Sequence, residues 1–334
     1  MKKLLTIMLV FIMAMALVSC RDDGGLIEWD YMNLDSPVYP SIPMLIEWSN
    51  EIYRRTDGRF RIHIRVGGEL PFTTGEYIEV VSNGLVEMAG AMITAVSPSL
   101  RAASLPSLPF MITNEESFHA VMNVLNPYLD EELAEWGVFN AMTLFHPYQE
   151  IYGIGPIPSS YRDLAGLRLR TTGAQQARFW HEVGLVPTPI DAAEVSSALN
   201  TRIIEGVTAA SMAVDLNRWY ESLEWVYVCN QMFIPVYVVV NNAAWNRLPA
   251  DIQDVFKEVT AEFIATYPQR IIEAHHRSLA HMEANGIVFI EASQEDRQAL
   301  QNIAVPLWRE FAAANGANAQ RALAEIERVL NITQ

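Results

Sequence analysis

Strand-type segments alternate with helix-type segments along almost the whole chain. The clearest strand covers residues 60–66, Phe-Arg-Ile-His-Ile-Arg-Val, in which the apolar side chains face one way and the basic ones the other. A helical spacing of Met44, Leu45, Trp48 and Ile52 precedes it. This alternation predicts α/β layers built on largely parallel sheets. A chain of 334 residues is long enough for two domains.

The remaining elements follow from periodicity and from turn residues. The expected strands cover 26–31, 60–66, 87–93, 138–145, 167–171, 186–190, 207–212 and 287–291. The expected helices cover 43–57, 73–84, 114–125, 174–183, 191–200 and 215–223, with two more after residue 291. An apolar stretch over 226–240 is interrupted by Pro235. A helical pattern from 250 to 285 contains Pro268, which should kink so long a helix.

The segment 163–171, Asp-Leu-Ala-Gly-Leu-Arg-Leu-Arg-Thr, predicts a turn that leads into a strand. Leu167 and Leu169 alternate with Arg168 and Arg170, so the leucines face a core and the guanidinium groups face the opposite side. A guanidinium stays charged and pairs bidentately with a carboxylate, which makes an arginine at a strand end a natural anion clamp. The alternative is that both arginines are simply solvated.

The N-terminus predicts a secretory signal. Two lysines precede a run over 4–18 that is apolar except for Thr6, and this run is too short and wrongly flanked for a membrane span. The sequence Leu17-Val18-Ser19-Cys20 is similar to a bacterial lipobox. We therefore expect residues 1–20 to be a lipoprotein signal peptide, with Cys20 lipidated and the protein anchored on the outer face of a cytoplasmic membrane. The alternative is an ordinary signal peptide in which Cys20 is incidental.

The balance of charge excludes some classes of partner. The chain carries 23 Lys and Arg residues against 39 Asp and Glu residues, a net charge of −16. This balance argues against nucleic acid and against an anionic membrane surface as partners. Lys257 is the only lysine beyond the leader, so an anion site must be a local arginine-lined pocket. The second cysteine, Cys229, lies in an apolar run and is expected to be buried and inert.

Motifs of catalysis and cofactor binding are absent from the sequence. No Walker loop, G-x-S-x-G, H-E-x-x-H or dinucleotide-binding fingerprint occurs. The histidines at 275, 276 and 281 do not have the spacing of metal ligands on one helix face. Thr73 and Glu76 form a capping-box pattern, which alone would explain both residues. We therefore expect no cofactor, no metal ion and no enzymatic activity.

Several short stretches match a known family in order and spacing. They are 51–59, Gly68-Glu69-Leu70, 79–88, Leu108-Pro109-Phe110, 163–170, 186–199, Glu205-Gly206 and 241–249. Over nearly all of its length beyond the leader, the chain resembles the extracytoplasmic solute receptors of tripartite ATP-independent periplasmic (TRAP) transporters.

This resemblance implies an α/β, two-lobed periplasmic-binding-protein-like fold with a ligand cleft between the lobes and a long kinked spanning helix. The helix that contains Pro268 is the candidate for the spanning element. The expected division places 26–148 and about 236–268 in lobe I, and 149–235 and about 269–334 in lobe II. Hinges are expected near 148–152, near 231–236 and near Pro268.

The resemblance also implies which residues bind the ligand. Arg170 matches the arginine that clamps the ligand carboxylate in the family, whereas Arg168 is expected to be solvated. The other ligand-binding residues expected are Glu76, Thr94, Ala209, Trp219, Gln231 and Tyr237.

The chain departs from the family pattern inside the expected pocket. Ala192 and Ser196 replace an aromatic residue and a tyrosine that many members carry, and the run 207–210 lacks an asparagine used on the ligand. Gln149 stands near the column where sialic-acid binders carry a second arginine. These departures favour a monocarboxylate with an apolar or aromatic body over a C4-dicarboxylate or a sugar acid. The smaller side chains leave space in the expected pocket. This space is taken up either by the ligand or by a neighbouring aromatic residue, Trp180, Trp219 or Phe233.

The sequence therefore predicts a lipid-anchored receptor that captures a small organic carboxylate and delivers it to membrane permease subunits. The protein is expected in the periplasm or on the extracellular face of the cytoplasmic membrane. Two rival functions are a receptor that feeds a signalling partner and a secreted lipoprotein hydrolase that uses Cys229 or a carboxylate pair. The sequence argues against a hydrolase, because it places no general base near a nucleophile.

Overall fold

A computed structural model of the chain describes residues 25–332. The expected signal peptide and the lipidation of Cys20 therefore lie outside the described residues. The strands are β1 (Ile27–Met32), β2 (Phe60–Arg65), β3 (Met88–Met92), β4 (Val138–Gly153), β5 (Arg168–Thr171), β6 (Val186–Pro189), β7 (Gly206–Ala210), β8 (Trp225–Asn241) and β9 (Val288–Glu291). All eight expected strands are present, β4 is much longer than expected, and the apolar stretch over 226–240 forms the additional strand β8.

The strands form a single mixed sheet within the described residues. Their order is β2-β1-β3-β8-β4-β7-β5-β6, and β9 pairs with β8. We call the part built on β1, β2 and β3 lobe I, and the part built on β5, β6, β7 and β9 lobe II. Among the described residues five of the eight strand pairings are parallel, as expected, whereas the pairs β3–β8, β4–β8 and β4–β7 are antiparallel. The reason is that the chain crosses between the lobes along β4 and returns along β8.

Strands β4 and β8 change partners where they pass from one lobe to the other. β3 pairs with residues 236–240 of β8, whereas β7 pairs with 149–153 of β4 and β9 with 225–228 of β8. The β4–β8 register shifts between His146 and Gln149 and again before Ile151. This change of partners supports the predicted lobe boundaries near 148 and 235, which stay a prediction. The strand expected over 138–145 continues to Gly153 in the structure, and the irregular register accommodates Pro147.

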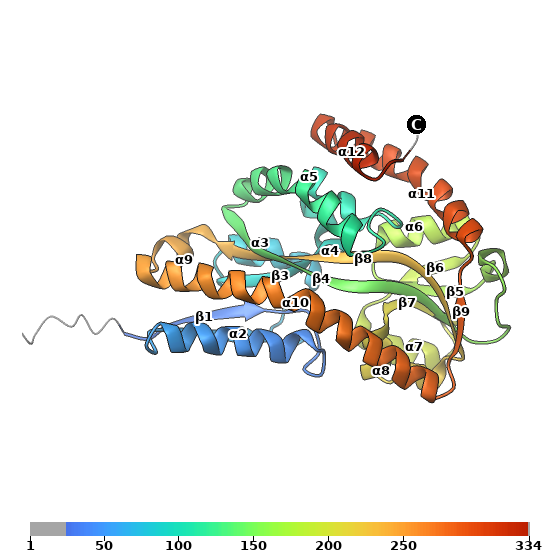
Figure 1. Cartoon of the computed structure of the whole chain (residues 1–334), viewed down its shortest axis with the longest axis horizontal. Helices are drawn as coiled ribbons and strands as arrows, with labels where there is room; N and C mark the ends of the chain where they lie inside the picture. Colours follow the sequence, from blue (N-terminus) through green and yellow to red (C-terminus); the bar gives the residue numbers. More distant parts are fainter. Residues whose placement is uncertain (1–24, 333–334) are drawn as a thin grey trace, which may run out of the picture.

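The helices cover both faces of the sheet (Figure 1). They are α2 (Ser41–Arg55), α3 (Tyr77–Ser82), α4 (Ile93–Val96), α5 (Glu115–Glu135), α6 (Ala174–Val183), α7 (Val195–Asn200), α8 (Ser211–Leu216), α9 (Asn242–Asn246), α10 (Ala250–Ala284), α11 (Gln294–Ala314) and α12 (Ala317–Val329). The helix expected over 215–223 was wrong, because α8 ends at Leu216 and a separate 3₁₀ turn, Trp219–Ser222, follows. Arg218 between them adopts a left-handed backbone (φ 57°), which an α-helix does not continue through.

Helix α10 spans both lobes, as the long helical pattern predicted. It packs against α2 in lobe I and against α8 in lobe II, and it bends about halfway along in Figure 1. Pro268 lies inside this helix without ending it. A proline removes one backbone hydrogen bond and crowds the preceding turn, so a bend rather than a break is the expected result in a helix packed along its length.

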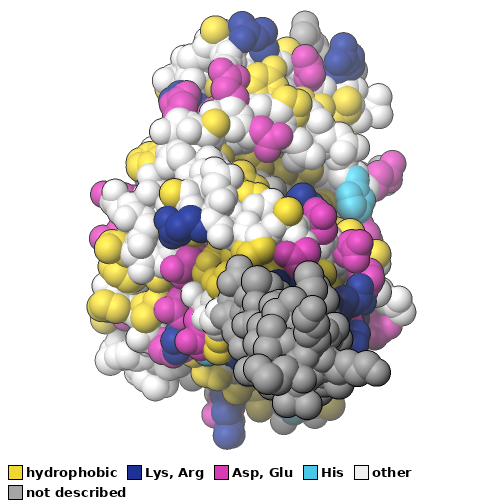
Figure 2. Space-filling view, turned by 90° about the vertical axis from the view of Figure 1, so that its left-hand side faces the viewer, with side chains coloured by type: hydrophobic (Ala, Val, Ile, Leu, Met, Phe, Trp, Pro, Cys, Tyr) yellow, Lys and Arg dark blue, Asp and Glu magenta, His cyan; other side chains and the backbone are white. Residues whose placement is uncertain are grey.

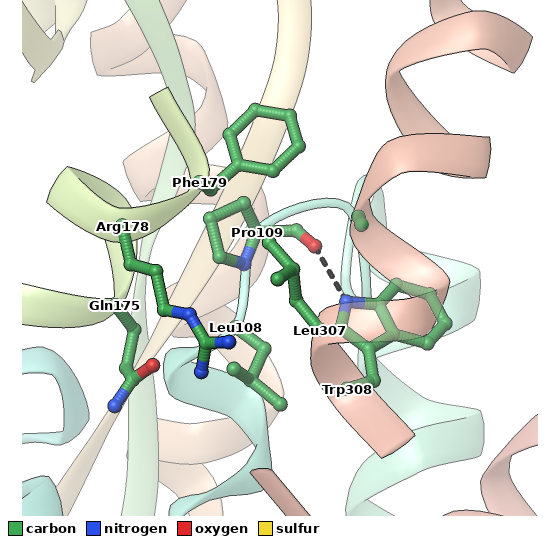
Figure 3. Close-up of a pocket in the computed structure, with 8 residues that line it drawn as sticks. Leu108, Pro109, Gln175, Arg178, Phe179, Leu307 and Trp308 are labelled. Atoms are coloured by element: carbon green, nitrogen blue, oxygen red, sulfur yellow. Dashed lines mark hydrogen bonds between the residues drawn. The ribbon is translucent and has the colours of Figure 1, made fainter. Parts of the chain in front are cut away.

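The C-terminal helices join the two lobes on the opposite face. Helix α11 packs against α6 of lobe II, whereas α12 packs against α5 of lobe I. This packing differs from the predicted placement of 269–334 in lobe II as one block. Figure 3 shows the contact between α11, α6 and the 108–109 loop, where the indole N–H of Trp308 donates to the Pro109 carbonyl at 2.9 Å. The crevice there has no space for even a water molecule, so it is a packing contact rather than a ligand site.

Lobe II has a small apolar core of its own in addition to the large core shared along the sheet. Val195, Val207, Val214 and Trp219 form it, and Met282 at the end of α10 closes it. The outer surface is mixed in charge. Figure 2 shows one end of the molecule, where acidic, basic and apolar side chains are interspersed rather than gathered into a basic patch.

A buried carboxyl group supports the crossing of β4 and β8. Glu150 is 1% exposed and accepts hydrogen bonds from the backbone N–H groups of Cys229 (2.7 Å) and Asn230 (2.8 Å). The Asn230 amide, with its nitrogen toward Glu150, donates to the other carboxyl oxygen at 2.7 Å and accepts from Arg297 at 3.2 Å. Asn230 adopts a left-handed backbone (φ 53°), and these bonds hold it there. Burial raises the pKa of Glu150 to about 8.

The raised pKa of Glu150 gives a prediction about stability. The native state keeps a proton on this carboxyl group at pH values where the unfolded chain has released it, so the contribution of Glu150 to stability falls as the pH rises from 4.5 to about 8. Glu150→Gln should therefore be more stable than the wild type at about pH 9, on the order of 2 kcal/mol, and nearly equal to it below about pH 5. Urea unfolding at both pH values measures this, with the exposed Glu325→Gln as the control. A pH-independent difference would contradict the assignment.

Candidate functional site

A cavity of about 450 Å³ lies between the two lobes, beside the crossing strands. Lobe I contributes Asp35, Tyr39, Phe72, Met92 and His146 to its walls. The opposite wall is contributed by Gln149, Arg170, Asp191, Ala209 and Trp219. The cavity therefore combines aromatic and apolar surface with a few charged groups, which is the usual composition of a small-molecule site.

Arg170 provides the buried positive charge of the cavity. It lies on the short strand β5, where the alternation places Leu169 in the core and leaves Arg168 exposed. Arg170 is 6% exposed, and its Nε donates to the Ile190 carbonyl (2.8 Å) and its Nη1 to the Thr208 carbonyl (3.0 Å). These two bonds fix the plane of the guanidinium group.

The remaining N–H groups of Arg170 have no carboxylate partner within salt-bridge distance in the part of the chain that the structure describes. Burial lowers the pKa of Arg170 to about 10, and the nearby charge of Asp191 acts in the opposite direction. The group therefore stays protonated at neutral pH although it has lost its water shell. A buried guanidinium with unused donors can pair strongly with an anion that enters the cavity. The guanidinium carbon also lies 5.9 Å from the centre of the Trp219 ring.

The wall opposite Arg170 carries an acidic group of lobe I. Asp35 follows β1 in a tight loop, where its N–H donates to Asn33 Oδ1 (2.6 Å) and its carbonyl accepts from the Gly67 N–H (2.8 Å). A Cβ at Gly67 would lie 2.3 Å from the Leu34 carbonyl oxygen, so only glycine permits this approach. The Asp35 carboxylate accepts from Ser41 Oγ and lies 3.3 Å from His146 Nε2.

The same wall contains a stacked aromatic pair. The His146 ring stacks on Tyr39 with centroids 4.9 Å apart, and both rings line the cavity. His146 and Asp35 each follow the end of a regularly paired strand segment. Polar residues at strand ends that open into a cleft are a general signal of binding sites. This signal could have pointed to Asp35, Tyr39 and His146, which were not among the predicted site residues.

The predicted site residues separate into three groups. Arg170, Ala209 and Trp219 line the cavity together. Thr94, Gln231 and Tyr237 are buried beside it: Gln231 accepts from the Trp180 indole N–H (2.9 Å), and Tyr237 donates to the Ala103 carbonyl (2.9 Å). Glu76 is exposed and belongs to a capping box with Thr73, whose N–H donates to it at 2.7 Å.

Some of the positions that depart from the family pattern line the cavity, and others do not. Ala192, Ala209 and Ala210 line the cavity, whereas Ser196 is exposed on α7 and Val207 is buried in the lobe II core. Among the aromatic residues expected to fill the freed space, Trp219 lines the cavity. Trp180 is held by Gln231, and Phe233 packs against Phe145 with centroids 4.4 Å apart.

The lobes touch at a close contact next to the cavity. Gly173 begins α6 of lobe II, and a Cβ there would come within 2.7 Å of the carbonyl oxygen of Thr94 in lobe I. Only a residue without a Cβ allows the two lobes to approach this closely.

Other sites in the described residues give weaker candidates. A more open hollow of about 490 Å³ on lobe I contains Trp245 and Phe256, but its only cation is Lys257, which is exposed and paired with Asp254 at 3.3 Å. Cys229 is buried, and its burial raises the pKa of the thiol well above its usual value, which is the reverse of an activated nucleophile. The described residues contain no cluster of three or more His, Cys, Asp or Glu side chains suited to a metal ion.

Comparisons with known proteins agree with this architecture. The profile of the bacterial extracellular solute-binding protein family 7 (DctP) matches residues 35–315. A solute-binding protein of Chromohalobacter salexigens is 22% identical over 291 residues, which cover 85% of this chain and 84% of that protein.

Solved structures show the same fold. The extracytoplasmic solute receptor DctP6 of Bordetella pertussis, which binds pyroglutamic acid, superposes with a TM-score of 0.84 at 18% identity and covers 90% of this chain and 100% of that one. A TRAP periplasmic solute-binding protein of Chromohalobacter salexigens with bound D-glucuronate has a TM-score of 0.82 at 18% identity and covers 91% of this chain and 100% of that one. Because the family profile covers most of the chain, this protein belongs to family 7 of the bacterial extracellular solute-binding proteins, the family of TRAP transporter solute receptors.

Proposed function

We propose that the protein captures a small organic monocarboxylate in the cavity between its lobes and delivers it to the permease subunits of a TRAP transporter. The observation that carries this proposal is the buried guanidinium group of Arg170, which lines the cavity and has unused N–H donors. A ligand carboxylate would pair with them bidentately and compensate for the water that Arg170 has lost. In this reading the chain acts as a receptor and catalyses no reaction.

The charges of the cavity favour a ligand with one carboxylate. Arg170 shares the cavity with two carboxylates, Asp35 on the opposite wall and Asp191 on its own wall. A second carboxylate on the ligand would therefore meet negative charge rather than another arginine. Beside Arg170 the wall includes alanines at 192, 193, 209, 210 and 213 and Trp219, together with the polar residues Thr172 and Asn217. This composition suits an apolar or aromatic body, and the solved relatives described above bind ring-shaped acids.

Ligand capture is proposed to close the lobes about the crossing strands. Tyr148 and Asn230 adopt left-handed backbones there, with φ of 40° and 53°. Pro268 lies inside the spanning helix α10, where it would let the helix bend as the lobes close. The contact between Thr94 and Gly173 would then form only in the closed state, which the ligand stabilises by bonding to both lobes.

Members of this family are periplasmic, and we propose that this protein is held at the membrane through a lipid on Cys20. In the residues that the structure describes, no helix has both the length and the apolar character needed to cross a bilayer. Delivery of the ligand to a permease would therefore rest on contact between the folded receptor and that permease.

The clamp predicts a loss of affinity on substitution of Arg170. Arg170→Lys keeps the charge but loses the planar fork, and Arg170→Ala leaves the ligand carboxylate unpaired in a closed cavity. The alanine variant should lose about 2–5 kcal/mol of binding free energy in calorimetry with an acid that the wild type binds.

The matched control for this experiment is Arg168→Ala. Arg168 is exposed on the same strand and pairs with Glu205 at 3.0 Å, away from the cavity. Its removal should change the affinity little. Binding by Arg170→Ala within threefold of the wild type, as an approximate limit, would rule out the clamp.

Closure predicts a change in the shape of the protein in solution. Small-angle scattering should report a more compact particle at saturating ligand than without ligand, because the cavity lies between lobes joined by few crossings. Identical profiles in both conditions would count against a receptor that closes about a hinge.

The cavity chemistry predicts which acids bind. A thermal-shift screen should give larger stabilisation with aromatic or branched-chain monocarboxylates than with succinate, malate or a uronate, because the cavity has one arginine, two carboxylates and a group of alanines beside the arginine. Strong stabilisation by the diacids or the uronate, with none from the monocarboxylates, would show this ligand class to be wrong.

A further inference from the structure

The two lobes meet at a seam beside the ligand cavity, between Thr94 of lobe I and the start of helix α6 in lobe II. Thr94 lies in α4, directly after β3. A Cβ on Gly173, which precedes α6, would lie 2.7 Å from the Thr94 carbonyl oxygen and 3.8 Å from the Thr94 Cβ. Both the backbone and the side chain of Thr94 therefore lie against the start of α6. Within the described part of the chain, Thr94 is not among the residues that line the cavity, so the seam is separate from the ligand site.

The hydroxyl group of Thr94 is buried at this seam without a partner. Thr94 is 7% exposed, and its Oγ1 atom makes no hydrogen bond within residues 25–332. The other buried threonines are bonded: the Thr56 hydroxyl donates to the Ile52 carbonyl at 2.9 Å, for example, and the Thr208 hydroxyl donates to Gln176 Oε1 at 3.0 Å. The unpaired hydroxyl group is therefore a property of the lobe contact and not of buried threonines in this fold.

Contact between the lobes makes this hydroxyl group costly. The start of α6 takes the place of water at Thr94, and Gly173 has no side chain that could replace the lost hydrogen bond. A hydroxyl group that leaves water without a new partner raises the free energy of the state in which it is buried. When the lobes separate, α6 moves away from Thr94 and water returns to Oγ1. The cost therefore falls on the closed form.

We propose that the seam between Thr94 and α6 is a conformational device that holds the empty receptor open. The unpaired hydroxyl group of Thr94 makes closure unfavourable until a ligand contributes bonds to both lobes. This inference rests on the proposed function, in which the lobes close about the crossing strands when an acid binds. It adds that a residue outside the cavity controls how readily the lobes close.

Gly173 makes the opposite contribution to the same seam. Its backbone is extended (φ −173°), a conformation that any residue adopts, so the local backbone does not require glycine here. Space requires it, because a Cβ would overlap the Thr94 carbonyl oxygen. The missing Cβ of Gly173 thus permits closure, whereas the hydroxyl group of Thr94 opposes it. Two substitutions at one contact should therefore change the affinity in opposite directions.

Thr94→Val removes the hydroxyl group and keeps the shape of the side chain. Because the closed form no longer carries this cost, a larger fraction of the receptor is competent to hold a ligand and the observed affinity rises. Calorimetry with phenylacetate, an aromatic monocarboxylate, should show binding about three- to tenfold tighter than that of the wild type. Stopped-flow measurements should show slower release at a nearly unchanged association rate. An affinity equal to or weaker than that of the wild type would overturn the role of the hydroxyl group.

The matched control is Thr56→Val. Thr56 follows α2 in lobe I, and its fully buried hydroxyl group is bonded. Its replacement should lower the thermal stability of the protein and leave the affinity for phenylacetate within about twofold of the wild type. If Thr56→Val raised the affinity as much as Thr94→Val, the effect would not belong to the seam and the proposal would fail.

Gly173→Ala places a Cβ against the Thr94 carbonyl oxygen and should hinder closure. It should weaken the binding of phenylacetate by about tenfold or more. Thermal unfolding without ligand should resemble that of the wild type, because the empty receptor is open and the overlap is absent there. Small-angle scattering with phenylacetate should give a profile close to that of the empty wild type. A variant that becomes as compact as the wild type would show that the seam is not part of closure.

The outcomes separate this inference from the proposed function. If the wild type becomes more compact with phenylacetate while Thr94→Val keeps the wild-type affinity, the role of the seam fails and the receptor function stands. If the wild type binds phenylacetate without any change in its scattering profile, closure fails and this inference fails with it, whereas capture of an acid stands. If neither phenylacetate nor any other acid of the thermal-shift screen binds, the proposed function and this inference fail together.

Discussion

The antiparallel pairing of β4 with β8 is the constraint on which the rest of the structure depends. Both strands run through the two lobes, so the sheets of the lobes are one sheet whose strands change partners at the crossing. The cavity lies beside this crossing because the register shifts between His146 and Ile151 open the regular ladder there. The residues of this irregular part divide between two tasks: Gln149 faces the cavity, and Glu150 supports the crossing from the other side.

Burial of polar groups at the crossing is what gives the site its binding capacity. Arg170 keeps its charge although it is almost fully buried, because two backbone carbonyls orient it and Asp191 lies nearby. Gln149 lines the same cavity. Such groups reduce the stability of an empty cavity, and the same free energy becomes available to a ligand that satisfies them. A receptor that closes on its ligand therefore benefits when buried polar groups of the empty cavity lack some of their hydrogen-bond partners.

Local patterns in the sequence were sufficient for the element order and for the strand that carries Arg168 and Arg170. The alternation of Leu167, Arg168, Leu169 and Arg170 assigned opposite faces to the two residue types, and the structure has Leu169 buried and Arg168 exposed. The same pattern could not tell which arginine is buried in a cavity. The lengths of the strands could not be predicted from local patterns either, because β4 continues past Pro147 through a change of register that no local rule describes. Glu76 is the opposite case, because its capping box could be predicted from the spacing of Thr73 and Glu76 alone.

By itself the sequence determined the alternating elements, the spanning helix with Pro268, the acidic balance and the family to which the chain belongs. These features depend on periodicity and composition, which are local properties of the chain. Only the tertiary structure decided that the sheet is mixed, that α12 returns to lobe I, and that Asp35, His146 and Gln149 line one cavity with Arg170. Asp35 and Arg170 are far apart in the sequence and meet because β4 crosses between the lobes. Their shared environment therefore follows from long-range strand pairing, which local spacing does not encode.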